Sequence, residues 1–378
     1  MHSNQAKPGK PRLMSLDALR GFDMFWILGG EGLFAALLAL TGWQGWTWGD
    51  AQMHHSQWHG FTFYDLIFPL FIFLSGVALG LSPKRLDRLP FSERRPHYLH
   101  GVKRLALLIV LGIVYNHGWG AGLPADPDKV RYASVLARIG FAWFFAALLV
   151  WHTGLRTQII CALGILCGYA ALQLWLPFPG GSAGVLTQTG SINAYVDSHW
   201  LPGITYRQRE YDPEGLLSTL PAIVNALAGV FTGHFIIRPH VKGEWFKVAM
   251  LVLAGGLCLG LGWWLDAVLA VNKDLWTSSF VLVTSGWSLI LLALFYALVD
   301  VLKWQKAFFP FVVIGTNAII IYLASSLFDW AFLAKSLFGG VIAAAPLAAQ
   351  QLLGVIALLL VQWLLLRWLY LRGIFIRI

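Results

Sequence analysis

Charged residues are scarce in this chain. Asp, Glu, Lys and Arg together make up 12% of its 378 residues, about half of the roughly 25% that is typical of soluble domains. Hydrophobic residues make up 58% and occur in long continuous runs, whereas a membrane β-barrel shows short alternating segments. The shortage of charge therefore argues against a soluble domain and predicts an all-α, polytopic membrane protein.

Cysteine is rare as well. Cys161, Cys167 and Cys258 all lie inside apolar runs, so we expect buried, unreactive thiols and neither a disulfide framework nor a metal site. The polar, basic start of the chain does not resemble a signal peptide. The net charge of +9 fits the excess of Lys and Arg in cytoplasmic loops of membrane proteins, and we do not expect a nucleic-acid partner.

About ten apolar runs are long enough to span a bilayer, which takes about 20 residues. They are centred near residues 28, 71, 109, 143, 166, 226, 257, 289, 318 and 360. An N-terminus in the cytoplasm places most of the 27 Lys and Arg residues in cytoplasmic segments, which predicts that both termini are cytoplasmic. Residues 1–378 then form one transmembrane domain with a cytoplasmic tail, 1–14. The outside loops are 41–60, 116–133, 177–215, 270–276 and 329–345.

Polar residues within the spans are costly and tend to mark function or pairing. Asp17 and Glu31 share one face of the first predicted helix, and we expect Asp17 or Asp23 to pair with Arg20 three residues away. Glu31 has no such basic neighbour, which suggests that it faces a substrate. Arg138 lies about two turns into an apolar helix, where it needs an acidic or phosphate partner.

Residues Tyr211–Gly215 precede another apolar run. Asp212 is a natural N-cap there, with Pro213 at the first helical position and Glu214 in the first turn. Capping is sufficient to explain Asp212 by itself. A second role for Asp212 and Glu214, binding the hydroxyl groups of a ligand, stays open.

The most unusual stretch is Met53–Pro69, which contains His54, His55, Trp58, His59 and Asp65. An unperturbed histidine has a pKa of about 6.5 and can act as a base near neutral pH. Interfacial aromatic residues also collect in such loops, and this plainer interpretation applies most to His54 and His59. The histidine spacing does not favour a zinc site.

Six segments in order resemble the heparan-α-glucosaminide N-acetyltransferase family, in particular its NagX-like bacterial members. They are Arg12–Gly21, His55–Pro69, Val130–Gly140, Tyr211–Gly215 with Ile223–Gly229, Asn272–Trp276 and Gly315–Tyr322. The resemblance covers nearly the whole chain. The family's active-site histidine corresponds to His55 when Trp58, Gly60 and Asp65 are matched. The family's asparagine after the first helix falls on Glu31, so a carboxylate replaces an amide.

The resemblance implies transfer of an acetyl group from cytoplasmic acetyl-CoA to an amino sugar of the glucosamine type at the periplasmic side of a bacterial inner membrane, by a multi-pass protein surrounded by lipid. His55 would be the general base or the acyl carrier, aided by Asp65 and Arg138. The expected sugar-binding residues are Glu31, Trp58, His59, Asp212, Glu214 and Asn317. Arg20, Lys103 and Arg104 would bind the phosphates of acetyl-CoA. No metal is expected.

Two alternatives share this architecture. A sugar transporter without chemistry also explains the ten spans and their polar residues. An O-acetyltransferase of a polysaccharide or lipid-linked sugar also uses acetyl-CoA but has a hydroxyl acceptor. The sequence leaves open the size of the acceptor and the oligomeric state, including a homodimer.

Overall fold

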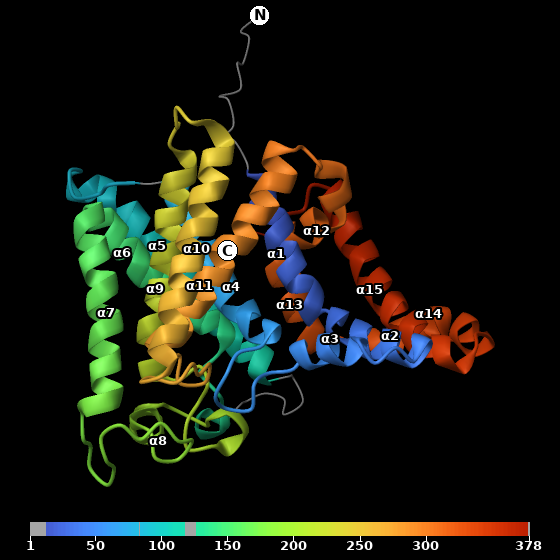
Figure 1. The fold of residues 1–378 in the computed structure, drawn as a ribbon, viewed down its shortest axis with the longest axis horizontal. Helices are drawn as coiled ribbons and strands as arrows, with labels where there is room; N and C mark the ends of the chain where they lie inside the picture. Colours follow the sequence, from blue (N-terminus) through green and yellow to red (C-terminus); the bar gives the residue numbers. More distant parts are fainter. Residues whose placement is uncertain (1–12, 83, 118–125, 377–378) are drawn as a thin grey trace, which may run out of the picture.

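A computed structural model describes residues 13–82, 84–117 and 126–376. The described residues form helices joined by loops (Figure 1). The helices are α1 Met14–Ile27, α2 Leu33–Thr41, α3 Trp46–Gln52, α4 Phe63–Gly80, α5 Phe91–His117, α6 Val135–His152, α7 Leu155–Trp175, α8 Ile192–Trp200, α9 Leu216–Ile237, α10 Gly243–Asp266, α11 Ser278–Phe295, α12 Gln305–Thr316, α13 Ala318–Leu327, α14 Trp330–Ala344 and α15 Leu347–Leu371. A π-helical turn, Tyr296–Val301, extends α11.

Eight helices in the described chain are long and apolar enough to cross a membrane, and the number reaches ten if each of two bent pairs counts as one span. The predicted polytopic all-α fold is therefore confirmed. The first pair, α1 with α2, bends by 66° at Gly29, whose φ of 118° suits glycine. The second pair, α12 with α13, bends by 62° at Asn317.

The bend after α1 corrects one expectation from the sequence. We expected Asp17 and Glu31 to lie on one face of a continuous helix, but Glu31 lies beyond the bend in a short 3-10 turn, Gly30–Gly32. Three segments predicted as outer loops also contain helices. Residues 41–60 contain α3, Trp46–Gln52. Residues 329–345 form the apolar helix α14, and residues 177–215 contain α8.

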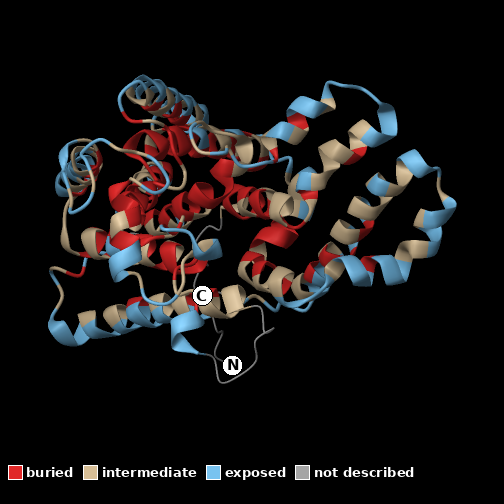
Figure 2. Ribbon diagram, turned by 90° about the horizontal axis from the view of Figure 1, so that it is seen from below, coloured by how far each residue is buried: buried red, intermediate tan, exposed pale blue. Residues whose placement is uncertain are grey.

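Close helix contacts hold the centre of the bundle. Gly76 of α4 lies so near α9 that a Cβ there would meet the carbonyl oxygen of Ala226, and Gly21 of α1 faces the backbone of α12 at Phe311 in the same way. Small residues let helix backbones approach closely in membranes. Figure 2 shows the buried residues concentrated in the centre of the bundle, with exposed faces on the surrounding helices.

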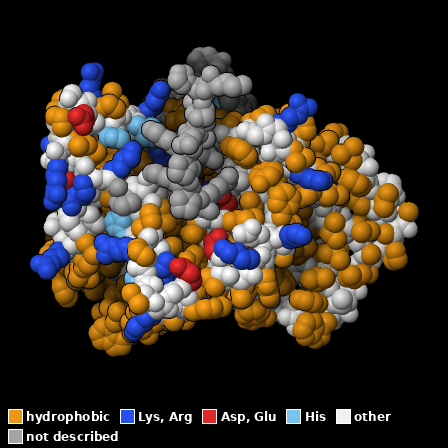
Figure 3. Space-filling model, turned by 90° about the horizontal axis from the view of Figure 1, so that it is seen from above, with side chains coloured by type: hydrophobic (Ala, Val, Ile, Leu, Met, Phe, Trp, Pro, Cys, Tyr) orange, Lys and Arg blue, Asp and Glu red, His pale blue; other side chains and the backbone are white. Residues whose placement is uncertain are grey.

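The two ends of the bundle differ in their side chains. The His55 loop lies at one end, together with α8 and the turn between α10 and α11 (Figure 1). The opposite end carries the basic loop between α4 and α5, with Lys84, Arg85 and Arg88 exposed. Figure 3 shows this face, where Lys, Arg and His side chains gather over one half of the surface and hydrophobic side chains over the other.

Candidate functional site

A cavity of about 540 Å³ lies between α1, α4, α5, α6 and α13, next to the His55 loop. Its mouth is polar and is formed by His55, Gln57, Arg131, Tyr206, Arg207, Arg209, Glu214, Lys273 and Asp274. Its inner part is apolar and is formed by Met24, Ile27, Ile67, Phe68, Phe71, Leu136, Ile139 and Ile319. Pockets of this size commonly hold small ligands, which are oriented by a few polar groups.

His55 stands at the mouth of this cavity and is held by Asp65 at the start of α4. Its Nδ1 lies 2.8 Å from Asp65 Oδ1. The Asp65 side chain is 0% exposed, and its Oδ2 accepts hydrogen bonds of 3.1 Å from the backbone N–H of Ser56 and the N–H and hydroxyl of Thr62. A carboxylate held in this way accepts from Nδ1–H, so the lone pair of His55 lies on Nε2.

The aromatic ring of Tyr64 packs beside His55, with ring centroids 4.8 Å apart. The Tyr64 side chain also lies close to the Glu31 carboxylate. Tyr64 therefore stands near both His55 and Glu31, although Glu31 itself is exposed and does not line the cavity.

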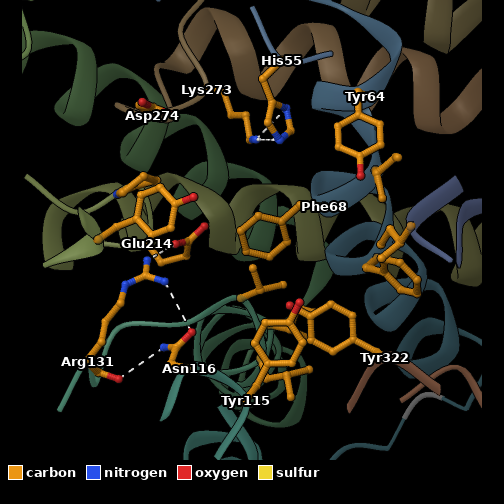
Figure 4. A pocket seen from close by; sticks show the side chains of 18 of the residues that line it. His55, Tyr64, Phe68, Tyr115, Asn116, Arg131, Glu214, Lys273, Asp274 and Tyr322 are labelled. Atoms are coloured by element: carbon orange, nitrogen blue, oxygen red, sulfur yellow. Dashed lines mark hydrogen bonds and ion pairs between the residues drawn. The ribbon is translucent and has the colours of Figure 1, made fainter. Parts of the chain in front are cut away.

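Lys273 approaches His55 from the turn between α10 and α11. Its Nζ lies 3.0 Å from both ring nitrogens of His55 and 3.8 Å from Asp65 Oδ1. Figure 4 shows His55 and Lys273 side by side, with Phe68 below them and Arg131 on the opposite side beside Glu214. Our sequence-based site did not include Lys273. Its position in Asn272–Trp276, one of the segments of family resemblance, was the available signal.

Across the mouth, Arg131 binds both carboxylates that we predicted from Tyr211–Gly215. Its guanidinium donates to Asp212 at 2.8 and 2.6 Å and to Glu214 at 2.5 Å. Burial opposes the charge of Arg131, but these bonds outweigh it and raise the pKa of the guanidinium. Glu214 lines the cavity, whereas Asp212 is buried behind it.

Asp212 is not the N-cap of α9, which corrects the sequence-based interpretation. The cap position is Gly215, and Asp197 of α8 accepts from the backbone N–H of Leu216 at 2.9 Å and of Asp212 at 3.1 Å. Burial raises the pKa of Asp197 to about 6. A carboxylate from a distant helix thus takes the capping role.

Arg138 is 1% exposed and lies apart from the cavity wall. It hydrogen-bonds Ser218, and its guanidinium lies 4.6 Å from the ring centroid of Trp276. Its Nε and Nη1 have no hydrogen-bond partner among the described residues. The structure therefore brings Arg138 to Trp276 and Ser218, with no hydrogen bond or ion pair to Asp65 in the described chain.

Trp58 and His59 fix loops beside the mouth and do not line the cavity. The indole of Trp58 donates to the carbonyl of Leu186 at 2.8 Å, which ties the long loop before α8 to the His55 loop. His59 Nε2 lies 2.8 Å from Asp266 Oδ1 at the end of α10. Both side chains are thus occupied by structural contacts.

Asn317 lies at the bend between α12 and α13. Its amide donates to the carbonyl of Ile374 at 3.0 Å and accepts from the N–H of Ile376 at 3.2 Å. These bonds hold the C-terminal segment against the bend. Asn317 precedes the cavity residue Ala318 but does not line the cavity itself.

The three basic residues predicted to bind phosphates lie towards the other end of the bundle. Arg20 pairs with Asp17 at 3.4 Å, as we predicted from their spacing, whereas Asp23 is buried with Oδ2 unpartnered. The Arg104 guanidinium lies 4.0 Å from the ring centroid of Trp143. Its Nε has no hydrogen-bond partner among the described residues. Its positive charge is repelled by that of Arg20. Lys103 is exposed.

Helix periodicity places Arg20 and Arg104 in line with the cavity. On α1, Arg20 lies four residues from Met24 and on the same face, and Met24 lines the cavity. On α6, Trp143 follows the lining residue Ile139 by four residues. Arg20 and Arg104 thus stand about one helical turn beyond the inner end of the cavity. Among the residues that the structure describes, no three His, Cys, Asp or Glu side chains are placed to hold a metal ion.

Comparison with known proteins gives two similar sequences. The chain is 28% identical over 375 residues to heparan-alpha-glucosaminide N-acetyltransferase of Mus musculus and 27% identical over 376 residues to that of Homo sapiens. Each match covers 84% of this chain but 55% and 53% of the relatives, so the chain spans about half the length of the curated relatives it matches. No family model matches. The resemblance to the heparan-α-glucosaminide N-acetyltransferase family is confirmed, and the likeness to its bacterial members stays a prediction.

Proposed function

With the heparan-α-glucosaminide N-acetyltransferases as relatives of this multi-pass membrane protein, we propose that it transfers an acetyl group from acetyl-CoA to the amine of an amino sugar of the glucosamine type. One observation carries the proposal. A His–Asp pair with the histidine lone pair on Nε2 stands at the polar mouth of a cavity whose inner part is apolar. A base beside two distinct binding regions is what acyl transfer between two substrates requires.

The acetyl donor approaches from the end opposite His55, which we predict to be cytoplasmic. An anion fits there because the Arg104 guanidinium lies over the Trp143 ring, close to the like charge of Arg20, and has an unpartnered Nε. Lys103 adds charge at the surface. The apolar inner cavity suits the uncharged arm between the phosphates and the thioester. Acetyl-CoA thus supplies the activated acetyl group at His55.

The amino sugar binds at the mouth, on the side that we predict to be periplasmic. His55 Nε2 takes a proton from its ammonium, and the free amine attacks the thioester carbonyl. The amide bond forms, the C–S bond breaks, and the CoA thiol leaves with a proton. Glu214, which lines the mouth, accepts hydrogen bonds from the sugar. Glu31, Trp58, His59, Asp212 and Asn317 support the walls through the contacts described above.

The test is CoA release by the purified full-length chain in detergent, with acetyl-CoA and with or without glucosamine. We expect release that requires the amine and disappears in the His55→Ala variant, whereas His54→Ala, which changes an exposed neighbour bonded to the Asp50 carbonyl, retains turnover. CoA binding by His55→Ala, measured as a thermal shift, shows that the variant is folded.

Other outcomes would favour other functions. One equivalent of CoA released without an acceptor, with an acetylated protein, supports an acyl-histidine intermediate. Transfer to a neutral sugar but not to glucosamine supports an O-acetyltransferase. A folded protein that releases no CoA with any acceptor refutes acetyl transfer and favours a transporter.

A further inference from the structure

The turn that carries Lys273 is built rigidly. Asn272 Oδ1 accepts from the backbone N–H of Leu275 at 2.8 Å. Trp276 adopts a left-handed φ of 51°, and its buried indole donates to Asn225 at 2.9 Å. A left-handed non-glycine residue costs energy and persists only where the surroundings impose it. The turn therefore presents Lys273 in one defined position.

The same turn is tied to the His55 loop. Asn272 donates to the carbonyl of Trp58 at 2.8 Å, and the N–H of Gly60 donates to the carbonyl of Val271 at 2.9 Å. These bonds cross between segments more than 200 residues apart in the sequence. The distance between Lys273 and His55 is thus set by backbone contacts and does not depend on the two side chains alone.

Lys273 shares its counterion, Asp65, with His55. Its side chain is 16% exposed, and its nearest acid, Asp65, lies 3.8 Å away and already accepts from His55, Ser56 and Thr62. Burial lowers the pKa of Lys273, and the positive charge of Arg138 lowers it further. The carboxylates of Asp65, Glu214 and Asp274 act in the opposite direction. The Lys273 ammonium has three N–H donors. One of them faces His55 Nε2 at 3.0 Å, and the ammonium lines the cavity, where the others can reach a ligand.

We propose that Lys273 is a further catalytic residue, whose ammonium donates a hydrogen bond to the thioester carbonyl oxygen as that oxygen becomes negative. The inference rests on the acetyl transfer proposed above. When the amine attacks, the carbonyl electron pair moves to oxygen. When the C–S bond breaks, the pair returns and the amide remains, so Lys273 keeps its proton throughout. A preorganised donor in a site of low dielectric constant stabilises such a charge strongly.

This assignment gives Lys273 a position beside His55, where we had expected Arg138 to aid catalysis. Both cations lie near α4, but Arg138 bonds Ser218 and packs on Trp276 outside the cavity wall. Lys273 lines the cavity and lies 3.0 Å from the nitrogen that removes the proton. A donor and a base at this separation can reach the oxygen and the nitrogen of the same tetrahedral intermediate.

The experiment compares the Lys273→Met and Lys273→Arg variants of the full chain, with Lys129→Met as the matched control, because the Lys129 side chain is 81% exposed and does not line the cavity. We expect Lys273→Met to lower kcat by about 10²–10³-fold, with KM for acetyl-CoA and the CoA-induced thermal shift close to wild type. Lys273→Arg keeps the charge and retains more activity, and Lys129→Met matches wild type.

A chemical rescue separates catalysis from packing. Alkylation of the K273C variant with 2-bromoethylamine restores an ammonium on a side chain of nearly the same length, and we expect kcat to recover. Wild-type protein treated in the same way controls for the three native cysteines. A kcat for Lys273→Met within about threefold of wild type, a loss confined to KM, or failure of the rescue would each overturn the role of Lys273. Wild-type protein that transfers nothing to any amine would instead refute the proposed function, and Lys273 with it.

Discussion

The Asp65→Asn substitution examines the His55–Asp65 pair most directly. Three donors converge on Oδ2 of Asp65 and one, His55 Nδ1–H, on Oδ1. Asparagine has one oxygen, which the three donors from Ser56 and Thr62 would retain. Its NH₂ group would then face His55 Nδ1, which must become the acceptor. The ring proton moves to Nε2, and the lone pair that takes the substrate proton is lost.

The size of the effect follows from that change of tautomer. General base catalysis contributes about 10²–10⁴-fold to a rate, so we expect kcat to fall by that factor. The fold should suffer little, because the buried backbone N–H groups keep an acceptor, whereas alanine would leave each unsatisfied at a cost of about 1–3 kcal/mol. The assay is chromatographic quantification of CoA and uses no thiol reagent, because Cys167 is exposed in the structure, contrary to the buried thiol that we expected from the sequence.

The comparison includes His55→Ala as the inactive reference and His54→Ala as the active one. Thermal unfolding with and without CoA shows whether the Asp65→Asn protein is folded and binds the donor. If Asp65→Asn turns over within about threefold of wild type while His55→Ala is inactive, the carboxylate does not set the tautomer of His55 and the reasoning is refuted.

Three further predictions concern the donor site, the alkaline limit and the helix packing. Arg104→Leu should raise KM for acetyl-CoA by about tenfold or more through the loss of a charge-assisted bond, with kcat nearly unchanged; an unaltered KM would remove Arg104 from the donor site. Burial lowers the pKa of Lys273, and its protonated form is the active one. Turnover should therefore fall as the pH rises, with a midpoint below the ordinary lysine pKa of about 10.4. Lys273→Arg should move this limit to higher pH, and a limit that stays in place would contradict the role of Lys273. Gly76→Ala should lower Tm, since its Cβ would meet the Ala226 carbonyl and overpacking costs about 1–3 kcal/mol; an unchanged Tm would show that α4 and α9 can separate freely.

The helical architecture was predictable because each span is a continuous apolar run. The bends were not, because Gly29 and Asn317 interrupt the runs without adding a polar segment. Their effect depends on how α2 and α13 pack. Helix α14 was assigned to a loop because its 15 residues fall short of the length that a span requires. Hydropathy thus predicts which segments enter the membrane better than it predicts their direction.

The site was only partly predictable, for a different physical reason. His55 and Asp65 lie ten residues apart and belong to one motif, so their association could be inferred locally. Lys273 reaches His55 from 218 residues away, and Arg131 meets Asp212 from 81 residues away. Such pairs are created by helix packing, and periodicity within one segment carries no information about them.

The spacing of Arg20, Met24 and Ile27 on α1 sets the length of acetyl donor that can reach His55. Seven residues separate Arg20 from Ile27, a rise of about 10 Å in a helix of 1.5 Å per residue, and the cavity continues from there to His55. A donor whose phosphates bind Arg20 and Arg104 places its thioester at His55 only if the chain between phosphates and thioester has the length of that distance. Selection among thioesters is then a matter of reach, and a truncated donor without the phosphates loses alignment even though its reactive bond is the same.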